Sequence, residues 1–313
     1  MEPDIRDAIV GYVAMLTKRT HIPLKRVLGW LGLKKNKYHQ WRKRLGVANH
    51  HNGKVPRWTW ILPWERDAIL AYRRLHREEG YRCLTYMMLD QDIVAVSPSS
   101  TYRVLKSAGM LSRWNTFKPL KKRGFDQPLQ VHDHWHVDIK YVNFHGTFLF
   151  LISVIDGFSR YIVHHELRLT MQEYDVQVTI ERALGLYPGV HPRIISDNGT
   201  QFIAKDFTEY MREKGLQHVR TSICHPQSNG KIERFHKTIT EECLRKESFL
   251  DLDDARRRVA EYIASYNTVR LHSAIYFLTP DDVLNGRMKA RLDERQRKLD
   301  AAAALRRLER QAA

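Results

Sequence analysis

The stretch that decides the fold runs from residue 194 to residue 237. It opens with Ile-Ile-Ser-Asp-Asn-Gly (194–199) and closes with His-Pro-Gln-Ser-Asn-Gly-Lys-Ile-Glu-Arg-Phe-His-Lys (225–237). Each motif contains one acid, Asp197 and Glu233, and 35 residues separate the two. A third acid, Asp138, lies upstream in Trp-His-Val-Asp-Ile-Lys-Tyr-Val (135–142). Holding two divalent cations for phosphodiester chemistry takes about three carboxylates that converge from different elements.

Local patterns place each acid on its own element. Residues 134–144 alternate between polar and apolar side chains, which predicts a strand with its apolar side toward the core. Residues 193–196 form a β-branched run before Asp197-Asn198-Gly199, so Asp197 is expected at the carboxyl end of a strand. Residues 228–246 have helical spacing that sets Glu233 opposite an apolar stripe. Taken singly, such acids are more often turn or surface residues, and Asp156-Gly157 is predicted to be a hairpin turn outside the site.

Four separated motifs occur in order between residues 130 and 245. They are Trp135-x-x-Asp138, Ile155-Asp156-x-x-Ser159-Arg160, Ser196-Asp197-Asn198-Gly199-x-x-Phe202 and Pro226-x-x-Asn229-Gly230-x-x-Glu233-Arg234. Together they resemble the catalytic core of retroviral integrases and, more closely, the integrase-type transposases of bacterial insertion sequences. The resemblance implies a ribonuclease-H-like α/β core with a mixed five-stranded sheet and helices on both faces.

The resemblance also implies a mechanism. Asp138, Asp197 and Glu233 would be the catalytic residues and the ligands of two Mg2+ (or Mn2+) ions, with Asp138 shared by both ions. The activity implied is metal-dependent cleavage at transposon ends, then strand transfer of the 3′-hydroxyl into target DNA. Without cations, three close carboxylates should raise the pKa of at least one of them. The alternatives are a non-catalytic DNA-binding repressor or domesticated form, and a ribonuclease-H-type nuclease without joining activity.

Charge separates the front of the chain from its core. The net charge of +17 indicates a polyanionic partner. Residues 1–129 hold 25 Lys and Arg against 10 Asp and Glu, a net of +15, whereas residues 130–250 hold 14 against 15, a net of −1. The front third is therefore the part expected to bind DNA electrostatically.

Helical patterns at 4–18, 23–31 and 34–44 predict an amino-terminal helix-turn-helix domain over residues 1–47. Its last helix presents the cations predicted to bind DNA: Lys34, Lys35, Lys37, Arg42, Lys43 and Arg44. The alternative is a small bundle with a solvated basic face. Residues 48–63, with Asn-His-His-Asn-Gly and two prolines, are interpreted as a linker.

A second helix-turn-helix is predicted over residues 64–111, from helical patterns at 64–78, 82–90 and 97–106, with Ser97 as the N-cap of the last helix. Its candidate DNA contacts are Ser99, Ser100, Arg103 and Lys106. Tight packing on the core is the competing interpretation. Residues 112–129 follow as a basic linker whose Lys121, Lys122 and Arg123 are expected to track phosphates.

The core is assigned to residues 130–246. Its strands are expected at 134–144, 147–155, 160–168, 193–197 and 218–222, and its helices at 172–186, 204–214 and from 228. The helix that carries Glu233 also offers candidate DNA contacts: Asn229, Lys231, Arg234 and Lys237. His132, His134 and His136 are interpreted as side chains on an exposed strand face that are solvated or bound to neighbours, and not as a zinc site.

The closing region, 247–313, is predicted to be helical. Tyr266-Asn267-x-x-Arg270-x-His272 resembles the motif that packs the family's tail back on its core, and Arg270 and His272 are considered as further DNA contacts. A long charged helix is expected from Leu284 to Gln311. Its sparse stripe of Leu284, Met288, Leu292 and Leu299 suggests pairing with another protomer.

Composition sets the remaining expectations. There is no signal-peptide pattern, and the longest apolar run, 148–155, is too short to span a bilayer. Three scattered cysteines without a Cys-x-x-Cys pair fit a reducing compartment. We therefore expect a cytoplasmic, nucleoid-associated protein without a membrane partner. Its expected partners are double-stranded DNA, as terminal inverted repeats and target, and further copies of itself in a synaptic complex.

Overall fold

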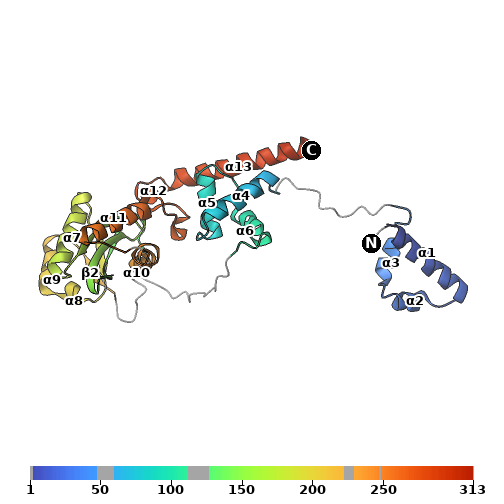
Figure 1. The fold of residues 1–313 in the computed structure, drawn as a ribbon, viewed down its shortest axis with the longest axis horizontal. Helices are drawn as coiled ribbons and strands as arrows, with labels where there is room; N and C mark the ends of the chain where they lie inside the picture. Colours follow the sequence, from blue (N-terminus) through green and yellow to red (C-terminus); the bar gives the residue numbers. More distant parts are fainter. Residues whose placement is uncertain (1–2, 48–59, 112–126, 222–228, 247, 313) are drawn as a thin grey trace. The chain divides into compact units, whose positions relative to one another are not determined.

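The computed structural model describes residues 3–47, 60–111, 127–221, 229–246 and 248–312 (Figure 1). The chain divides into two compact units, Met1–Trp60 and Ile61–Ala313. The division falls inside the predicted 48–63 linker. Most of that linker and of the 112–129 linker, including Lys121, Lys122 and Arg123, lies outside the described residues.

The first unit holds three helices where the sequence predicts them: α1 (Pro3–Thr20), α2 (Leu24–Trp30) and α3 (Lys35–Arg42). Val13, Val27 and Tyr38 meet in its buried core. Gly32 turns the chain between α2 and α3 with a φ of +61°, a left-handed conformation that glycine adopts without a Cβ clash. The buried Arg6 side chain donates to the carbonyls of Arg44 and Val47, so α1 also holds the segment after α3.

The second unit begins with another three-helix group: α4 (Pro63–Leu75), α5 (Tyr81–Asp90) and α6 (Pro98–Ser107). The side chain of Ser97 accepts a hydrogen bond from the amide of Ser100 at 3.3 Å, which confirms the predicted N-cap of α6. Ile69, Leu84 and Leu105 are fully buried where the helices meet. The group therefore has an apolar core of its own.

A mixed five-stranded sheet forms the centre of the second unit, as predicted. Its strands lie in the order β3-β2-β1-β4-β5, with β1 antiparallel to β2, β2 antiparallel to β3, and β4 parallel to β1 and to β5. The strands are β1 (His134–Phe144), β2 (Thr147–Asp156), β3 (Ile162–Arg168), β4 (Arg193–Ser196) and β5 (His218–Arg220). The predicted strand spans agree with these to within two residues at each end.

Helices cover both faces of the sheet, which completes the expected ribonuclease-H-like architecture. One face packs on α7 (Glu173–Leu186), α8 (Thr200–Ile203) and α9 (Lys205–Glu213) through a cluster that includes Trp135 and Phe207. The other face packs on α10 (Gly230–Ile239) and α11 (Leu252–Thr268) through a cluster that includes Phe235 and Val259. The helix predicted at about 204–214 agrees with α9 to within one residue at each end, and the short helix α8 before it was not predicted.

Both faces of β1 are buried over its first four residues, 134–137, which corrects one expectation. The side of β1 that carries His134 and His136 was predicted to be an exposed face, but these residues are 8% and 1% exposed. The reason is tertiary. Helix α10 packs against β1, and alternate side chains of a strand point to opposite faces, so α10 covers the polar set.

The carboxyl-terminal region folds back on its own chain. A π-helical turn, Thr240–Leu244, extends α10, and α11 then leads to a short 3-10 turn, Ser273–Ile275. Asn267 accepts a hydrogen bond from the amide of Ile162 at 2.9 Å and donates to the carbonyl of the same residue at 3.1 Å. The Tyr266-Asn267 motif thus ties α11 to the edge strand β3, as the resemblance implied.

The long terminal helix begins later than predicted. Residues Pro280–Leu284 form α12, the chain turns at Gly286 with a φ of +69°, and α13 spans Met288–Ala312. Met288 and Leu292, two members of the stripe assigned to a partner protomer, pack against Leu278 and Val283 of the same chain. Figure 1 shows α13 lying along α4 and α5. Within the described ranges, no helix is long and apolar enough to cross a bilayer.

Candidate active site

Asp138 lies in the middle of β1, opposite Ser153 of β2. Its Oδ1 accepts a hydrogen bond from the amide of Ile139 at 2.8 Å, and its Oδ2 lies 3.3 Å from Nδ1 of His236. The side chain is 19% exposed, so it remains open to solvent on one side. The central strand therefore holds this carboxylate between a backbone amide and a helix side chain.

Asp197 follows the last residue of β4, as the sequence predicts. The parallel register pairs His136 with Ile195, so two residues further along Asp138, in the middle of β1, comes level with Asp197, just past the carboxyl end of β4. Oδ1 of Asp197 accepts a hydrogen bond from the amide of Gly199 at 2.9 Å. A Cβ at Gly199 would approach that Oδ1 to 3.1 Å, so the turn favours glycine beside the carboxylate.

Glu233 lies in the first turn of α10, on its exposed side. Ile232 and Phe235 are fully buried on the other side of the helix and hold it against the sheet. Asp138 and Glu233 line one open groove of about 530 Å³ between β1 and the α10 segment. Its remaining lining residues are Ile139, Lys140, Tyr141, His236, Lys237, Thr240, Glu241 and Arg245.

Asp138 acts electrostatically on both other acids. Burial, with the negative charge of Asp138, raises the pKa of Asp197, while the Gly199 amide opposes the rise. Burial and the charge of Asp138 likewise raise the pKa of Glu233, which the nearby His236 opposes. Both pKa values shift in the expected direction, with burial as the larger cause, and Asp138 is the charged neighbour common to both.

The three acids supply the oxygen ligands that a hard divalent cation prefers. Burial first, and then the charge of Asp138, raise the pKa values of Asp197 and Glu233, and a bound cation would oppose both effects. In the described part of the chain, however, no group of three or more His, Cys, Asp or Glu is gathered closely enough to hold a metal ion. The carboxylate oxygens are suitable ligands for a divalent cation. Asp138 comes level with Asp197 and shares a groove with Glu233, but the three acids do not form a complete ligand set in the described structure.

Asp156 has the structural role assigned to it. It is fully buried, and its carboxylate accepts hydrogen bonds from the amides of His132 and Ser159 and from the hydroxyl of Ser159, at 2.8, 2.6 and 2.6 Å. The carboxylate holds the turn between β2 and β3. All of these contacts lie within the hairpin and the segment before β1, which is consistent with leaving Asp156 out of the site.

A buried polar layer lies beneath the start of α10. Burial lowers the pKa of His136 to about 3, and the Asn229 side chain beside it opposes this effect. Asn229 is only 3% exposed. Burial and the charge of Arg160 lower the pKa of Lys231 to about 8. Asn229 and Lys231, both predicted to contact DNA, therefore face the protein interior wholly or in part.

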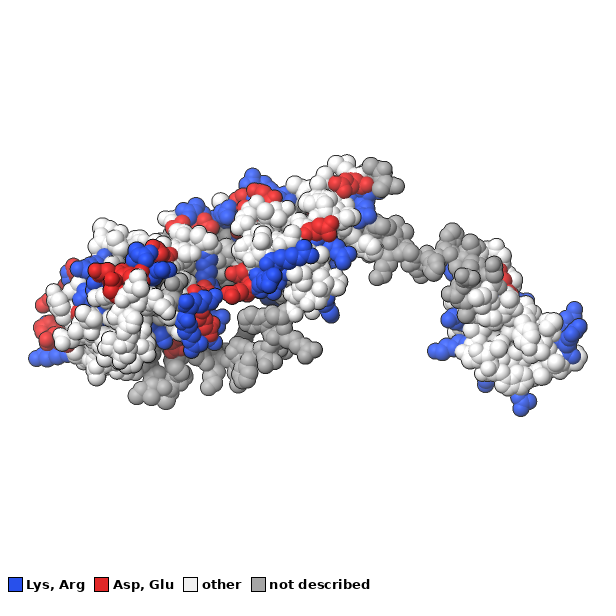
Figure 2. Space-filling model, in the orientation of Figure 1, with Lys and Arg blue, Asp and Glu red and all other residues white. Residues whose placement is uncertain are grey.

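Most other candidate DNA contacts are on the surface. In the first unit all six predicted cations are exposed, and Figure 2 shows mostly Lys and Arg among its charged side chains. The exposed candidates are Lys34, Lys35, Lys37, Arg42, Lys43, Arg44, Ser99, Arg103, Lys106, Arg234 and Lys237, and Ser100 is half-buried. Arg270 instead forms a bidentate ion pair with Glu242, at 2.7 and 2.9 Å, and His272 is buried, so the structure gives both residues internal partners.

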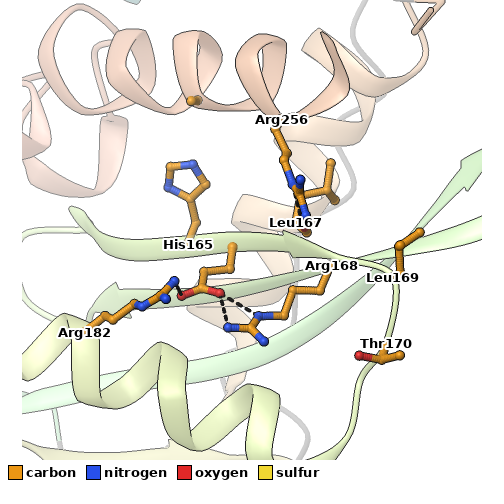
Figure 3. A pocket seen from close by; sticks show the side chains of 9 residues that line it. His165, Leu167, Arg168, Leu169, Thr170, Arg182 and Arg256 are labelled. Atoms are coloured by element: carbon orange, nitrogen blue, oxygen red, sulfur yellow. Dashed lines mark hydrogen bonds and ion pairs between the residues drawn. The ribbon is translucent and has the colours of Figure 1, made fainter. Parts of the chain in front are cut away.

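A second groove lies at the edge strand β3, between α7 and α11 (Figure 3). Two of its three arginines are paired with its one acid: Glu166 pairs with Arg168 and Arg182 at 2.5 and 2.7 Å. Arg256 donates to the carbonyl of Leu167 at 3.2 Å. None of the three candidate acids lines this groove, so the groove between β1 and α10 remains the candidate site.

The contact between His236 and Asp138 was not predicted from the sequence. Its spacing contained a usable signal. A residue three positions after Glu233 lies on the same side of an α-helix. The spacing does not show which strand this side of α10 faces.

Comparisons with known proteins agree with these observations. Two models described as integrase core domain match residues 128–226 and 214–280. The chain is 23% identical to the putative transposase InsK of insertion element IS150 from Escherichia coli, over 80% of this chain and 85% of that protein. It is 29% identical to the transposase of IS904 from Lactococcus lactis, over 47% of this chain and 59% of that one.

Coverage is partial for several relatives. The match spans between 29% and 62% of the lengths of three curated relatives. Among solved structures, the catalytic core domain of HTLV-2 integrase in complex with magnesium aligns with a TM-score of 0.40 and 18% identity. That alignment covers 50% of this chain and 98% of the integrase domain.

Proposed function

Because the chain belongs to the integrase-type transposases of insertion sequences, we propose that it is a DNA transposase of the DDE type. It would cleave at transposon ends and transfer the resulting 3′-hydroxyl into target DNA. The observation that carries the proposal is the relation of Asp138 to the other acids. Asp138 comes level with Asp197, which directly follows the neighbouring parallel strand, and it lines one groove with Glu233. Burial, together with the charge of Asp138, raises the pKa of both of these acids.

Asp138, Asp197 and Glu233 would hold two Mg2+ (or Mn2+) ions. When bound, such ions activate the attacking oxygen and neutralise charge on the leaving oxygen and the phosphate. The chain itself would orient the DNA. Arg234 and Lys237 are exposed on α10 beside Glu233, where they would hold backbone phosphates next to the groove. We assign Asn229 and Lys231 to support of α10, because both face the interior.

The two helical groups would supply the rest of DNA binding. The six exposed cations at and around α3 fit the phosphates of a duplex, and the exposed amino-terminal part of α6 fits the geometry of a helix that enters a groove. Cutting two ends together would take at least two copies of the chain. Double-stranded DNA and further copies of the protein are thus the proposed partners.

The test is strand transfer with purified protein, Mg2+, end DNA and a supercoiled target plasmid. The wild type should give joined product, and Glu233→Gln should give none while it still binds end DNA. Glu261→Gln is the matched control, since Glu261 is an exposed acid on α11 outside the groove and should join like the wild type. Tight binding without cleavage, in Mg2+ or Mn2+, would favour the repressor, and cleavage without joining would favour the nuclease.

A further inference from the structure

His236 contacts Asp138, a polar residue on another element of the described structure. It lies on α10 three residues after Glu233, and its side chain is 8% exposed. Nδ1 of His236 lies 3.3 Å from Oδ2 of Asp138. The other ring nitrogen, Nε2, is buried and has no hydrogen-bond partner among the described residues. The contact with Asp138 is therefore the polar anchor of this buried ring.

The contact with His236 gives the second carboxylate oxygen of Asp138 a polar neighbour. Its Oδ1 already accepts a hydrogen bond from the amide of Ile139. With Oδ2 beside His236, both oxygens have a neighbour, and rotation of the carboxylate about its terminal bond is restricted. The fully buried Phe235 fixes α10 against the sheet directly before His236, so the imidazole is presented by a rigid part of the fold.

We propose that His236 is a positioning residue of the site, one that holds the Asp138 carboxylate in place for a divalent cation. The proposal rests on the proposed function, since it takes Asp138 to be a metal ligand. A carboxylate already held in one orientation loses less conformational freedom when it binds a cation. Groups that orient metal ligands typically change metal affinity about 10- to 100-fold when they are removed.

The competing role is simple packing, in which the ring only fills space beneath α10. Two substitutions separate the roles. His236→Leu keeps an apolar side chain of similar bulk but removes the polar contact. His236→Asn shortens the side chain but returns an N–H group near the place of Nδ1. Packing alone predicts that Leu is tolerated better than Asn, whereas positioning predicts the reverse.

The matched control is Thr238→Val. Thr238 lies on the same helix at a similar depth, 7% exposed, and its hydroxyl donates to the carbonyl of Arg234 in its own helix at 2.8 Å. Its loss disturbs α10 without touching Asp138. Asp138→Asn is the reference for loss of the metal site itself.

The experiment is calorimetric titration of the full chain with Mn2+ at neutral pH, with thermal unfolding in chelator as the folding check. Compared with wild type, we expect about 10-fold or greater weakening for His236→Leu, recovery to within a few-fold for His236→Asn, and no change for Thr238→Val. Titration with Mn2+ measures the affinity of the metal site in the absence of DNA and turnover, so a defect in DNA binding does not affect the result.

The outcomes separate this inference from the function on which it rests. If wild type and Asp138→Asn bind Mn2+ equally, the proposed metal site is wrong. If Asp138→Asn loses binding but folded His236→Leu binds like wild type, the metal site stands and the positioning role of His236 is overturned. Equal weakening in His236→Leu and Thr238→Val would also overturn it, because a general disturbance of α10 would then explain the effect.

Discussion

Arg306 and Glu65, 241 residues apart in the sequence, form a buried ion pair that joins α13 to α4. Nη2 of Arg306 lies 2.7 Å from Oε1 of Glu65, and the side chains are 9% and 2% exposed. Oε2 of Glu65 also accepts a hydrogen bond from the amide of Leu62 at 2.7 Å, so one carboxylate caps α4 and receives the terminal helix. The carboxyl-terminal helix is thereby part of the structure that holds the second helical group.

Removing one partner of this pair should destabilise the second unit strongly. Arg306→Met leaves the Glu65 carboxylate buried without its counter-charge, and such losses cost about 3–5 kcal/mol. Urea unfolding of the full chain, followed by far-UV circular dichroism, measures the change. Arg297→Met is the matched control, because Arg297 is exposed on the same helix and its loss should stay within about 0.5 kcal/mol. Equal effects from both variants would contradict the role of the pair.

Four buried or half-buried histidines predict acid sensitivity well above the range in which carboxylates titrate. Burial lowers the pKa of His165 and His218 to about 4 and of His136 and His272 to about 3. An unfolded histidine has a pKa of about 6.5, so between about 6.5 and these values the unfolded state binds protons that the native state excludes. Stability should therefore fall as the pH drops below about 6.5, by up to about 1.4 kcal/mol per pH unit for each histidine.

Urea titrations at a series of pH values measure that slope. His165→Gln removes one of the four groups and should make the slope shallower between neutral pH and about pH 4. Exposed His21, in the first unit, provides the comparison, and His21→Gln should leave the slope of the second unit unchanged. A stability that is flat over this range would show that the histidines do not titrate as their burial implies.

Asp156→Ala should damage the fold and leave metal binding intact. The buried carboxylate accepts three hydrogen bonds from His132 and Ser159, and bonds to a charged acceptor contribute about 1.5–3 kcal/mol each. We expect a loss of several kcal/mol in the free energy of unfolding, with Mn2+ affinity of the remaining folded protein unchanged. Ser159→Ala, which removes one donor, should cost less. Loss of Mn2+ binding in folded Asp156→Ala would place Asp156 in the site after all.

Neutralising the exposed cations around α3 should weaken binding to all DNA sequences by a similar factor. Replacing Lys34, Lys35 and Lys37 with Gln should lower the slope of log affinity against log salt by about 0.9 for each phosphate that the protein no longer neutralises. Fluorescence anisotropy with duplex DNA over a range of salt concentrations measures the slope. Lys205→Gln is the control, since Lys205 is an exposed lysine on α9 in the second unit. An unchanged slope in the triple variant would leave the basic face of α3 as a solvated surface.

Local pattern alone determined most of the elements. The span of β1 was predicted without error from its alternation, and the start of α6 from its Ser-Pro cap. These features depend on neighbours within a few residues, so composition and spacing carry them. The three candidate acids were also identified from their motifs, and the strand that ends before Asp197 followed from a β-branched run and a turn.

Tertiary structure decided what each element faces. The sequence pattern predicts an exposed polar side for β1, but α10 covers that side. The apolar stripe of the terminal helix suggests a partner protomer, but Met288 and Leu292 pack against their own chain. The pairings of His236 with Asp138 and of Arg306 with Glu65 are likewise absent from any local pattern. Periodicity determines which side of a helix or strand is apolar and which is polar, but only the path of the whole chain brings each side to the element it contacts.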